Sequence, residues 1–312
     1  MLKQTVLAAA LALTPAAQAA AQLYSEAELA HTRASATPDI RAVFVEDIQG
    51  NLPRADRPRA AAITLAFPDR GPSPLSFYAD PATDTIYMPL ESIRFFDDVA
   101  TLFAWVESKG CDPTSVQAYL WAKLRDGQPL PAPLKAFHID RDIALADPFT
   151  DDVSLKIVSS GLQFILAHEL GHLMLGHRGG MSGADSQAQE IAADSFALDH
   201  FARLGGLPMG VFWYYMAAWW QDPVGRDARD ASTHPVSPER ISLLAERITD
   251  NPMAFSHGEL DPEREAGLAA GIGAMVANLA MLIDDDGMLS LMPIVLERDW
   301  PASRLATACP TE

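Results

Sequence analysis

Three residues able to bind a metal or move a proton stand in one apolar segment, at His168, Glu169 and His172. The apolar residues of 155–175 surround the axis of a helix, so we expect most of that helix to be buried. An unpaired carboxylate there would cost several kcal/mol. Positions four apart differ by about 40° around a helix axis, so both imidazoles project to one side and can hold one zinc ion. Glu169 lies beside them as a general base for a zinc-bound water. The alternative is a buried helix with two hydrogen-bonded histidines and a solvated glutamate.

A second helix, expected at 186–205 with a capping box from Ser186 and Gln189, carries two more acidic residues. Glu190 and Asp194 lie about 40° apart on the side that continues as apolar residues. Two inward carboxylates repel each other unless a cation or a donor lies between them. We therefore predict Glu190 as the third zinc ligand and Asp194 as the partner of a ligand's ring N–H. A solvated acidic face is the alternative.

Three further residues have less certain roles in the sequence. On a continued helix, His177 would point about 140° from His172, so we expect an end-of-helix residue rather than a ligand. A break of the helix at Gly176, which would bring His177 round towards the pair, is the alternative. His234 precedes a helix expected near Pro238 and is a candidate donor to an oxyanion, with a turn or capping role equally open. For Arg240, a surface ion pair is favoured over contact with a substrate carbonyl.

Together these motifs resemble a gluzincin metallopeptidase, in particular the M48 peptidases, which include bacterial HtpX-like and periplasmic quality-control proteases. The resemblance rests on HELGH at 168–172, EIAAD at 190–194 and the shorter Thr233-His234-Pro235. It implies a zincin-like fold, one zinc ion on His168, His172 and Glu190, Glu169 as the base, and endopeptidase activity on a polypeptide substrate. A different class of protein, a zinc-stabilised binding or chaperone-like module without turnover, would need a fourth protein ligand such as His177.

The elements around the motifs predict an α+β, predominantly helical fold. A strand at 62–67 and a hairpin at 75–88 precede the zinc-binding helix, which we expect to start at a Thr150 cap. Helices are also expected near 25–34, at 96–109 and at 115–125, and the aromatic run 211–220 predicts a core helix. We expect four regions: a signal peptide at 1–19, a mixed region at 20–149, a zinc-binding helical core at 150–250 and a helical region at 251–312 packing on the core.

The N-terminal residues and the composition bear on location and partners. Residues 1–19 have a basic start, a short apolar stretch and small residues at the end, the pattern of a secretory signal, so the mature chain is expected to be periplasmic or secreted. Cys111 and Cys309 could then pair. With 41 acidic and 23 basic residues, a net charge of −18 disfavours binding to nucleic acid. The apolar run 266–283 is predicted as a core helix rather than a membrane span.

Overall fold

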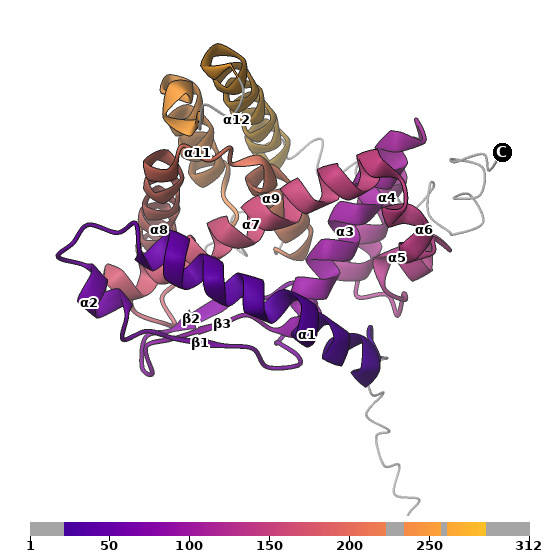
Figure 1. Cartoon of the computed structure of the whole chain (residues 1–312), viewed down its shortest axis with the longest axis horizontal. Helices are drawn as coiled ribbons and strands as arrows, with labels where there is room; N and C mark the ends of the chain where they lie inside the picture. The colour runs from indigo at the N-terminus through magenta and orange to yellow at the C-terminus, as the bar shows by residue number, and fades with distance from the viewer. Residues whose placement is uncertain (1–21, 223–233, 257–260, 285–312) are drawn as a thin grey trace, which may run out of the picture.

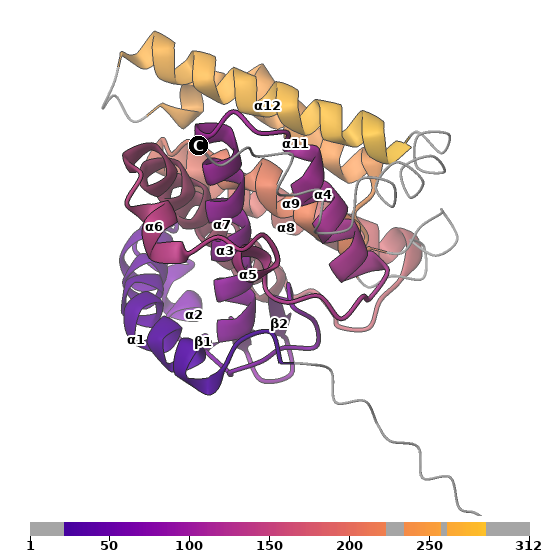
Figure 2. The ribbon, with the colours of Figure 1, turned by 90° about the vertical axis from the view of Figure 1, so that its right-hand side faces the viewer.

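The computed structural model describes residues 22–222, 234–256 and 261–284 (Figures 1 and 2). Its α-helices are α1 (Glu26–Ala42), α2 (Arg57–Ala60), α3 (Leu90–Ser108), α4 (Thr114–Leu120), α5 (Pro133–Ala136), α6 (Arg141–Leu145), α7 (Pro148–Met174), α8 (Gly183–Leu204), α9 (Met209–Gln221), α11 (Pro238–Asp250) and α12 (Pro262–Asp284). Three short helices of other pitch are η1 (Val43–Gln49), η2 (Trp121–Arg125) and η3 (Pro252–Phe255). With one three-stranded sheet beside these helices, the expected predominantly helical α+β fold is confirmed.

The sheet lies before α7 in the chain and contacts it. β1 (Thr64–Ala66) is parallel to β3 (Thr85–Tyr87), and β2 (Tyr78–Asp80) is antiparallel to β3. The strand order β1-β3-β2 makes β2 an edge strand, and both β2 and β3 pack against α7. The Asp80 side chain accepts hydrogen bonds from Ala82 N and Thr83 Oγ1, which closes the turn of the expected hairpin.

The helix α7 crosses the centre of the molecule in Figure 1. Its cap is Asp147, whose side chain accepts from the N–H groups of Phe149 and Thr150. The expected cap at Thr150 is therefore wrong, because Pro148 supplies the fixed φ of a first helical position and the helix starts before Thr150. The second half of α7 is buried on nearly all sides, as its apolar circumference predicted.

Other helix limits differ from the expectations. α8 begins at Gly183 after Ser182, and no side chain caps it, so the expected capping box at Ser186 is wrong. Its end at Gly205, with φ of 68°, agrees with the prediction. The helix expected near 25–34 continues to Ala42, and the one expected at 96–109 begins at Leu90.

The last helix, α12, packs on α11 along one face. Among the described residues it is the one helix whose length and composition would let it cross a membrane. Ala269, Val276 and Ile283 are buried, whereas Leu268 and Met281 are exposed. The segment 266–283 therefore contributes to the core through one side only. Cys309, the expected partner of Cys111, lies outside the described residues.

The helices α7 and α9 approach each other closely through two glycines. A Cβ added to Gly210 would lie 2.2 Å from the backbone nitrogen of Gly161 and 2.3 Å from the carbonyl oxygen of Ile157. The Gly210 N–H also donates to Ser160 Oγ at 2.7 Å. This contact sets the distance between the site helix and the aromatic helix α9.

We expect Gly210→Ala to lower the free energy of unfolding by about 1–3 kcal/mol or more, because the methyl group meets backbone that cannot move aside. Urea unfolding followed by circular dichroism measures this. Gly267→Ala is the matched control, since a Cβ there meets open space on α12, and it should raise stability by about 0.4–1 kcal/mol. Equal effects of the two substitutions would contradict the close contact.

Candidate metal centre and active site

Two turns of α7 and one face of α8 bring three buried side chains together. His168, His172 and Glu190 each offer a ligand atom, and these atoms all lie within 4.8 Å of one another. The Nε2 atoms of the two histidines are 3.1 Å apart. Glu190 Oε2 lies 3.4 Å from His168 Nε2, and Glu190 Oε1 lies 3.4 Å from His172 Nε2. These residues could hold a metal ion.

The spacing of the three side chains suits a small tetrahedral cation. Ligand atoms at about 2.0–2.1 Å from a tetrahedral ion lie about 3.3–3.4 Å from one another. The separations between His168, His172 and Glu190 are within a few tenths of an ångström of that value. Two imidazoles and one carboxylate are also the ligand set of many catalytic zinc sites.

The charges of the cluster show how a cation would fit. Burial lowers the pKa of His168, but hydrogen bonding to Asp194 and Glu190 outweighs it and raises this pKa to about 10. Burial, and then repulsion from His168, lowers the pKa of His172 to about 3. The two imidazoles face each other at 3.1 Å, and of the two His168 favours the protonated form. A bound cation would take the place of the proton on His168.

Asp194 and Arg240 form a buried network behind the cluster. Asp194 Oδ1 lies 2.8 Å from Nδ1 of His168, as expected for a carboxylate that orients a ligand. Arg240 donates from Nε to Asp194 Oδ2 at 2.6 Å and from Nη2 to Asp194 Oδ1 at 2.9 Å. Its Nη1 lies 2.8 Å from Glu190 Oε2. The Tyr215 hydroxyl completes the network by donating to Asp194 and accepting from Arg240, both at 2.6 Å.

The predicted surface ion pair of Arg240 is therefore wrong. The arginine is 4% exposed and belongs to the site. It neutralises two carboxylates that α8 directs inward, both of which also lie close to His168. A signal was present in the sequence, since two inward carboxylates require cationic partners, but nothing local to Arg240 identified it as one of them.

His177 occupies a position that the continued-helix expectation did not allow. Gly176, with φ of 69°, ends the helical path, and the chain turns back so that His177 Nδ1 lies 2.9 Å from His172 Nδ1. The break at Gly176 that the sequence left as an alternative is therefore the path the chain takes, and His177 follows the end of α7 as expected. His177 contacts Nδ1 of His172, whereas Nε2 of His172 faces Glu190. Among the described residues, His177 is not a member of the three-residue cluster.

Glu169 lies on the other side of α7 from Asp194, towards the sheet. It is 3% exposed, and burial raises its pKa, although His168 and a hydrogen bond with the backbone of Ala79 act in the opposite direction. Its Oε2 atom has no hydrogen-bond partner within the described ranges. A buried carboxylate oxygen without a partner requires an explanation, and a water or substrate proton at this position would supply one.

His234 also contacts the cluster, with Nδ1 at 2.7 Å from Glu190 Oε1. Its side chain is 54% exposed, in contrast to the buried residues around it. Burial lowers its pKa, but the contact with Glu190 outweighs this and the pKa is raised. A turn or capping role, one of the two alternatives from the sequence, does not by itself account for this contact.

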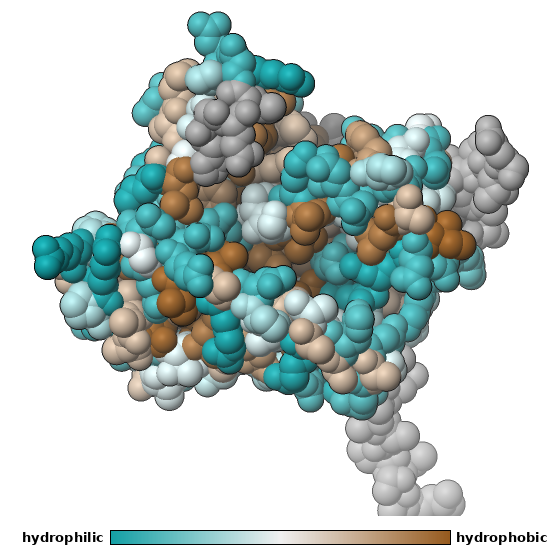
Figure 3. Space-filling view, in the orientation of Figure 1, coloured by the Kyte–Doolittle hydropathy of each residue, from teal (hydrophilic) through white to brown (hydrophobic). Residues whose placement is uncertain are grey.

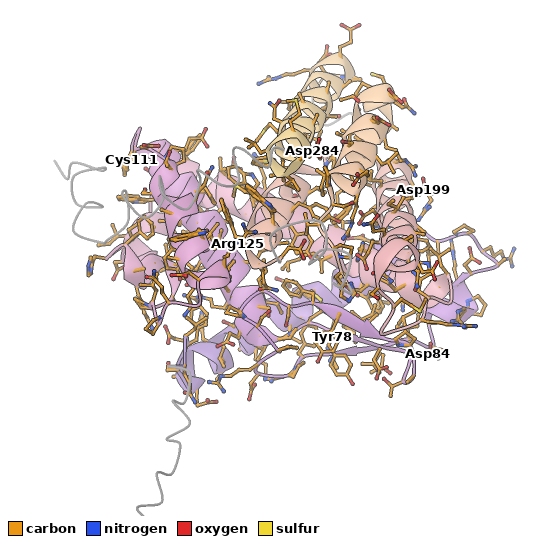
Figure 4. The ribbon with its side chains drawn as sticks, turned by 180° about the vertical axis from the view of Figure 1, so that it is seen from behind. Tyr78, Asp84, Cys111, Arg125, Asp199 and Asp284 are labelled. Atoms are coloured by element: carbon orange, nitrogen blue, oxygen red, sulfur yellow. The ribbon has the colours of Figure 1, made fainter. Side chains whose placement is uncertain are left out.

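Two hollows meet at Glu169, Glu190 and His234. The larger has a volume of about 470 Å³ and an aromatic wall that includes Phe77, Tyr78 and Tyr214. The smaller, about 50 Å³, continues past Ala79, Pro81 and the loop after α7. The strand β2 thus borders a cleft that contains Glu190 and His172 of the three-residue cluster. In Figure 4, Tyr78 lies on the sheet below this region, and Asp199 projects from the outer side of α8, away from it.

The chain matches the family model Peptidase U49 over residues 123–257. The match covers α7, α8, α9 and α11, and therefore His168, Glu169, His172, Glu190 and Arg240. No curated protein and no solved structure matches the chain. The match indicates a peptidase family, while the resemblance to the M48 peptidases stays an interpretation of the motifs.

Proposed function

We propose that this protein is a zinc-dependent endopeptidase of the zincin type. The observation that carries the proposal is the tetrahedral spacing of His168, His172 and Glu190 beside Glu169, inside the stretch that matches a peptidase family. Zinc held by these three residues would supply Lewis-acid chemistry, which acidifies water and polarises a peptide carbonyl.

Glu169 moves the proton in this mechanism. Burial raises the pKa of its carboxyl group, which makes the carboxylate a better base near neutral pH. The Oε2 atom is the acceptor for the proton of the attacking water, since the described residues provide no other partner for it. The same carboxyl then gives the proton to the amine that leaves.

His234 and Arg240 have separate tasks. The half-exposed imidazole of His234 stands at the junction of the two hollows and is placed to donate a hydrogen bond to a developing oxyanion. Arg240 and Asp194 hold Glu190 and His168 in position and do not reach the substrate. His177 orients His172 from the opposite ring nitrogen.

The edge strand β2 is the place where an extended polypeptide would bind. In the described sheet β2 pairs with β3 on one side only, and Tyr78 and Ala79 line the cleft, so the other edge of β2 borders it. An added strand would pair with this edge by main-chain hydrogen bonds. A side chain next to the scissile bond would enter the 470 Å³ hollow.

A non-catalytic zinc module is the less favoured function. It would require a closed site with four protein ligands. In the ranges 22–222, 234–256 and 261–284, the cluster contains three, and Glu169 lies beside it with an unpartnered oxygen. The proposed substrates are exported or envelope proteins, in keeping with the signal pattern of residues 1–19, which lie outside the described residues.

We expect the purified protein to contain about one zinc ion per chain by elemental analysis, and chelation to abolish cleavage of unfolded casein. Metal removal should also lower the thermal unfolding midpoint, because a ligand bound to the native state stabilises it. Zinc should restore both properties. His31→Ala, at an exposed position of α1, is the matched control and should bind zinc normally. Full activity at less than about one tenth of a zinc ion per chain would refute zinc dependence.

A further inference from the structure

A second large hollow lies along the first half of α7, away from the candidate active site. Its volume is about 530 Å³, and it shares no lining residue with the two hollows at Glu169. Its lining comes from α1 with η1, from α7, and from α3 and α6. Figure 3 shows apolar atoms in this depression between α1 and α7. We call it the α1–α7 groove.

Apolar side chains form the floor of the α1–α7 groove. Val43, Leu145, Leu155, Val158 and Leu162 all line it. Leu155, in the first half of helix α7, is 64% exposed, whereas the second half of this helix is deeply buried. A concave apolar surface of this size on a protein surface is typical of a binding site.

Unpaired carboxylates stand around this floor. Asp39, Asp47 and Asp151 line the groove and are exposed. In the part of the chain that the structure describes, none of the three has an ion-pair partner. The groove's two arginines are already committed, since Arg94 pairs with Asp98, and Arg141 pairs with Asp97 and Asp98. His31 is the remaining basic group in the lining.

The walls determine what shape of chain can bind. Helical walls present no unpaired N–H or C=O groups, so an extended peptide in the groove would leave its own backbone unsatisfied. A helix satisfies its backbone internally and offers a stripe of side chains to a groove. The lining of α7 extends from Asp151 to Leu166, about 22 Å at 1.5 Å per residue, which is the length of a helix of about 15 residues.

We propose that the α1–α7 groove binds an amphipathic helix of a partner polypeptide, with aliphatic side chains on the floor and lysine or arginine facing Asp39, Asp47 and Asp151. Charge complementarity selects this occupant, because an acidic helix or an anionic lipid surface would be repelled by the same carboxylates. The site is independent of the proposed peptidase activity and would hold a partner whether or not it is cleaved.

The test is fluorescence anisotropy with a labelled 15-residue helical peptide that has a leucine stripe and a lysine face. We expect this peptide to bind the full chain saturably, and added salt to weaken the binding. A peptide with the same leucine stripe but a glutamate face should not bind. Asp39→Asn, Asp47→Asn and Asp151→Asn combined should weaken binding about tenfold at low salt, since each removed ion pair contributes modestly. Leu155→Gln should weaken binding at all salt concentrations.

The controls make the same kinds of substitution at positions outside the groove. Asp185→Asn, Asp250→Asn and Asp284→Asn combined alter the net charge equally at exposed positions outside the groove. Leu268→Gln matches Leu155→Gln on α12. Equal weakening by both triple variants, or an undiminished affinity of Leu155→Gln, would overturn the proposal. Circular dichroism confirms folding, and Glu169-dependent cleavage of a short peptide should be unchanged by Leu155→Gln.

Discussion

Glu169→Gln is expected to keep about one zinc ion per chain while peptide cleavage falls by about 10²–10⁴-fold. The amide has nearly the shape of the carboxylate but cannot take up a proton. The three residues of the cluster do not include Glu169, so binding of the metal should persist. The two quantities are measured on one preparation, by elemental analysis and by initial rates on a quenched peptide.

Three variants make the result specific. Glu107→Gln removes an exposed carboxylate from α3 and should leave both quantities unchanged. His168→Ala should lose metal and activity together, because it deletes a member of the cluster. If Glu169→Gln cleaves at the normal rate, Glu169 is not the base. If it loses its zinc as well, Glu169 acts as a ligand instead.

Arg240→Met should lower the free energy of unfolding of the metal-free protein by about 3–5 kcal/mol. The substitution leaves Glu190 and Asp194 buried at 2% exposure each, without the cation that lies 2.8 Å from one and 2.6 Å from the other. Removing one partner of a buried ion pair costs much more than the pair contributes, because the remaining charge is desolvated and uncompensated. Urea unfolding in the presence of a chelator measures the change.

Arg247→Met on the same helix is the matched control. Arg247 pairs with Asp199, but the two side chains are 42% and 53% exposed, so the loss should be below about 1 kcal/mol. Adding Asp194→Asn to Arg240→Met should recover part of the loss, since one orphaned charge is removed. Similar losses for Arg240→Met and Arg247→Met would show that the buried network contributes no more than a surface pair.

Acid–base behaviour distinguishes the two histidines of the cluster. With no metal, His168 keeps its proton up to a pKa of about 10, and the pKa of His172 is about 3. The raised pKa of His168 stabilises the metal-free fold below the ordinary histidine pKa, and this contribution is lost as the pH rises towards 10. A cation competes with this proton, so its affinity should increase with pH over the same range.

Periodicity along single helices predicted most of the candidate site. His168 and His172 lie on the same side of one helix because they are four residues apart. Glu190 and Asp194 lie on the same side of the next helix for the same reason. The apolar positions showed which side of the helix at 186–205 faces inward and that the helix at 155–175 is buried on most sides. The hairpin at 75–88 followed from two short strand-like segments on either side of a turn sequence at 80–84. Each of these inferences uses only neighbours within about two helical turns.

Contacts between distant segments were not accessible in this way. Arg240 lies 46 residues after Asp194, and its burial depends on how α11 packs against α8. The contact of His177 with His172 depends on a break at Gly176, which the sequence allowed but did not require. The α1–α7 groove also exists only because two helices about 120 residues apart diverge.

The amino-acid order by itself determined which side chains share one face of α7 and which share one face of α8, because helical geometry repeats every 3.6 residues whatever surrounds it. Tertiary structure decided that those two faces meet at ligand distance and that an arginine from a third helix neutralises the two carboxylates. It also decided that β2 borders the cleft at this cluster. The physical reason is that the direction in which each helix packs depends on the summed burial of many side chains across the molecule, which no local pattern contains.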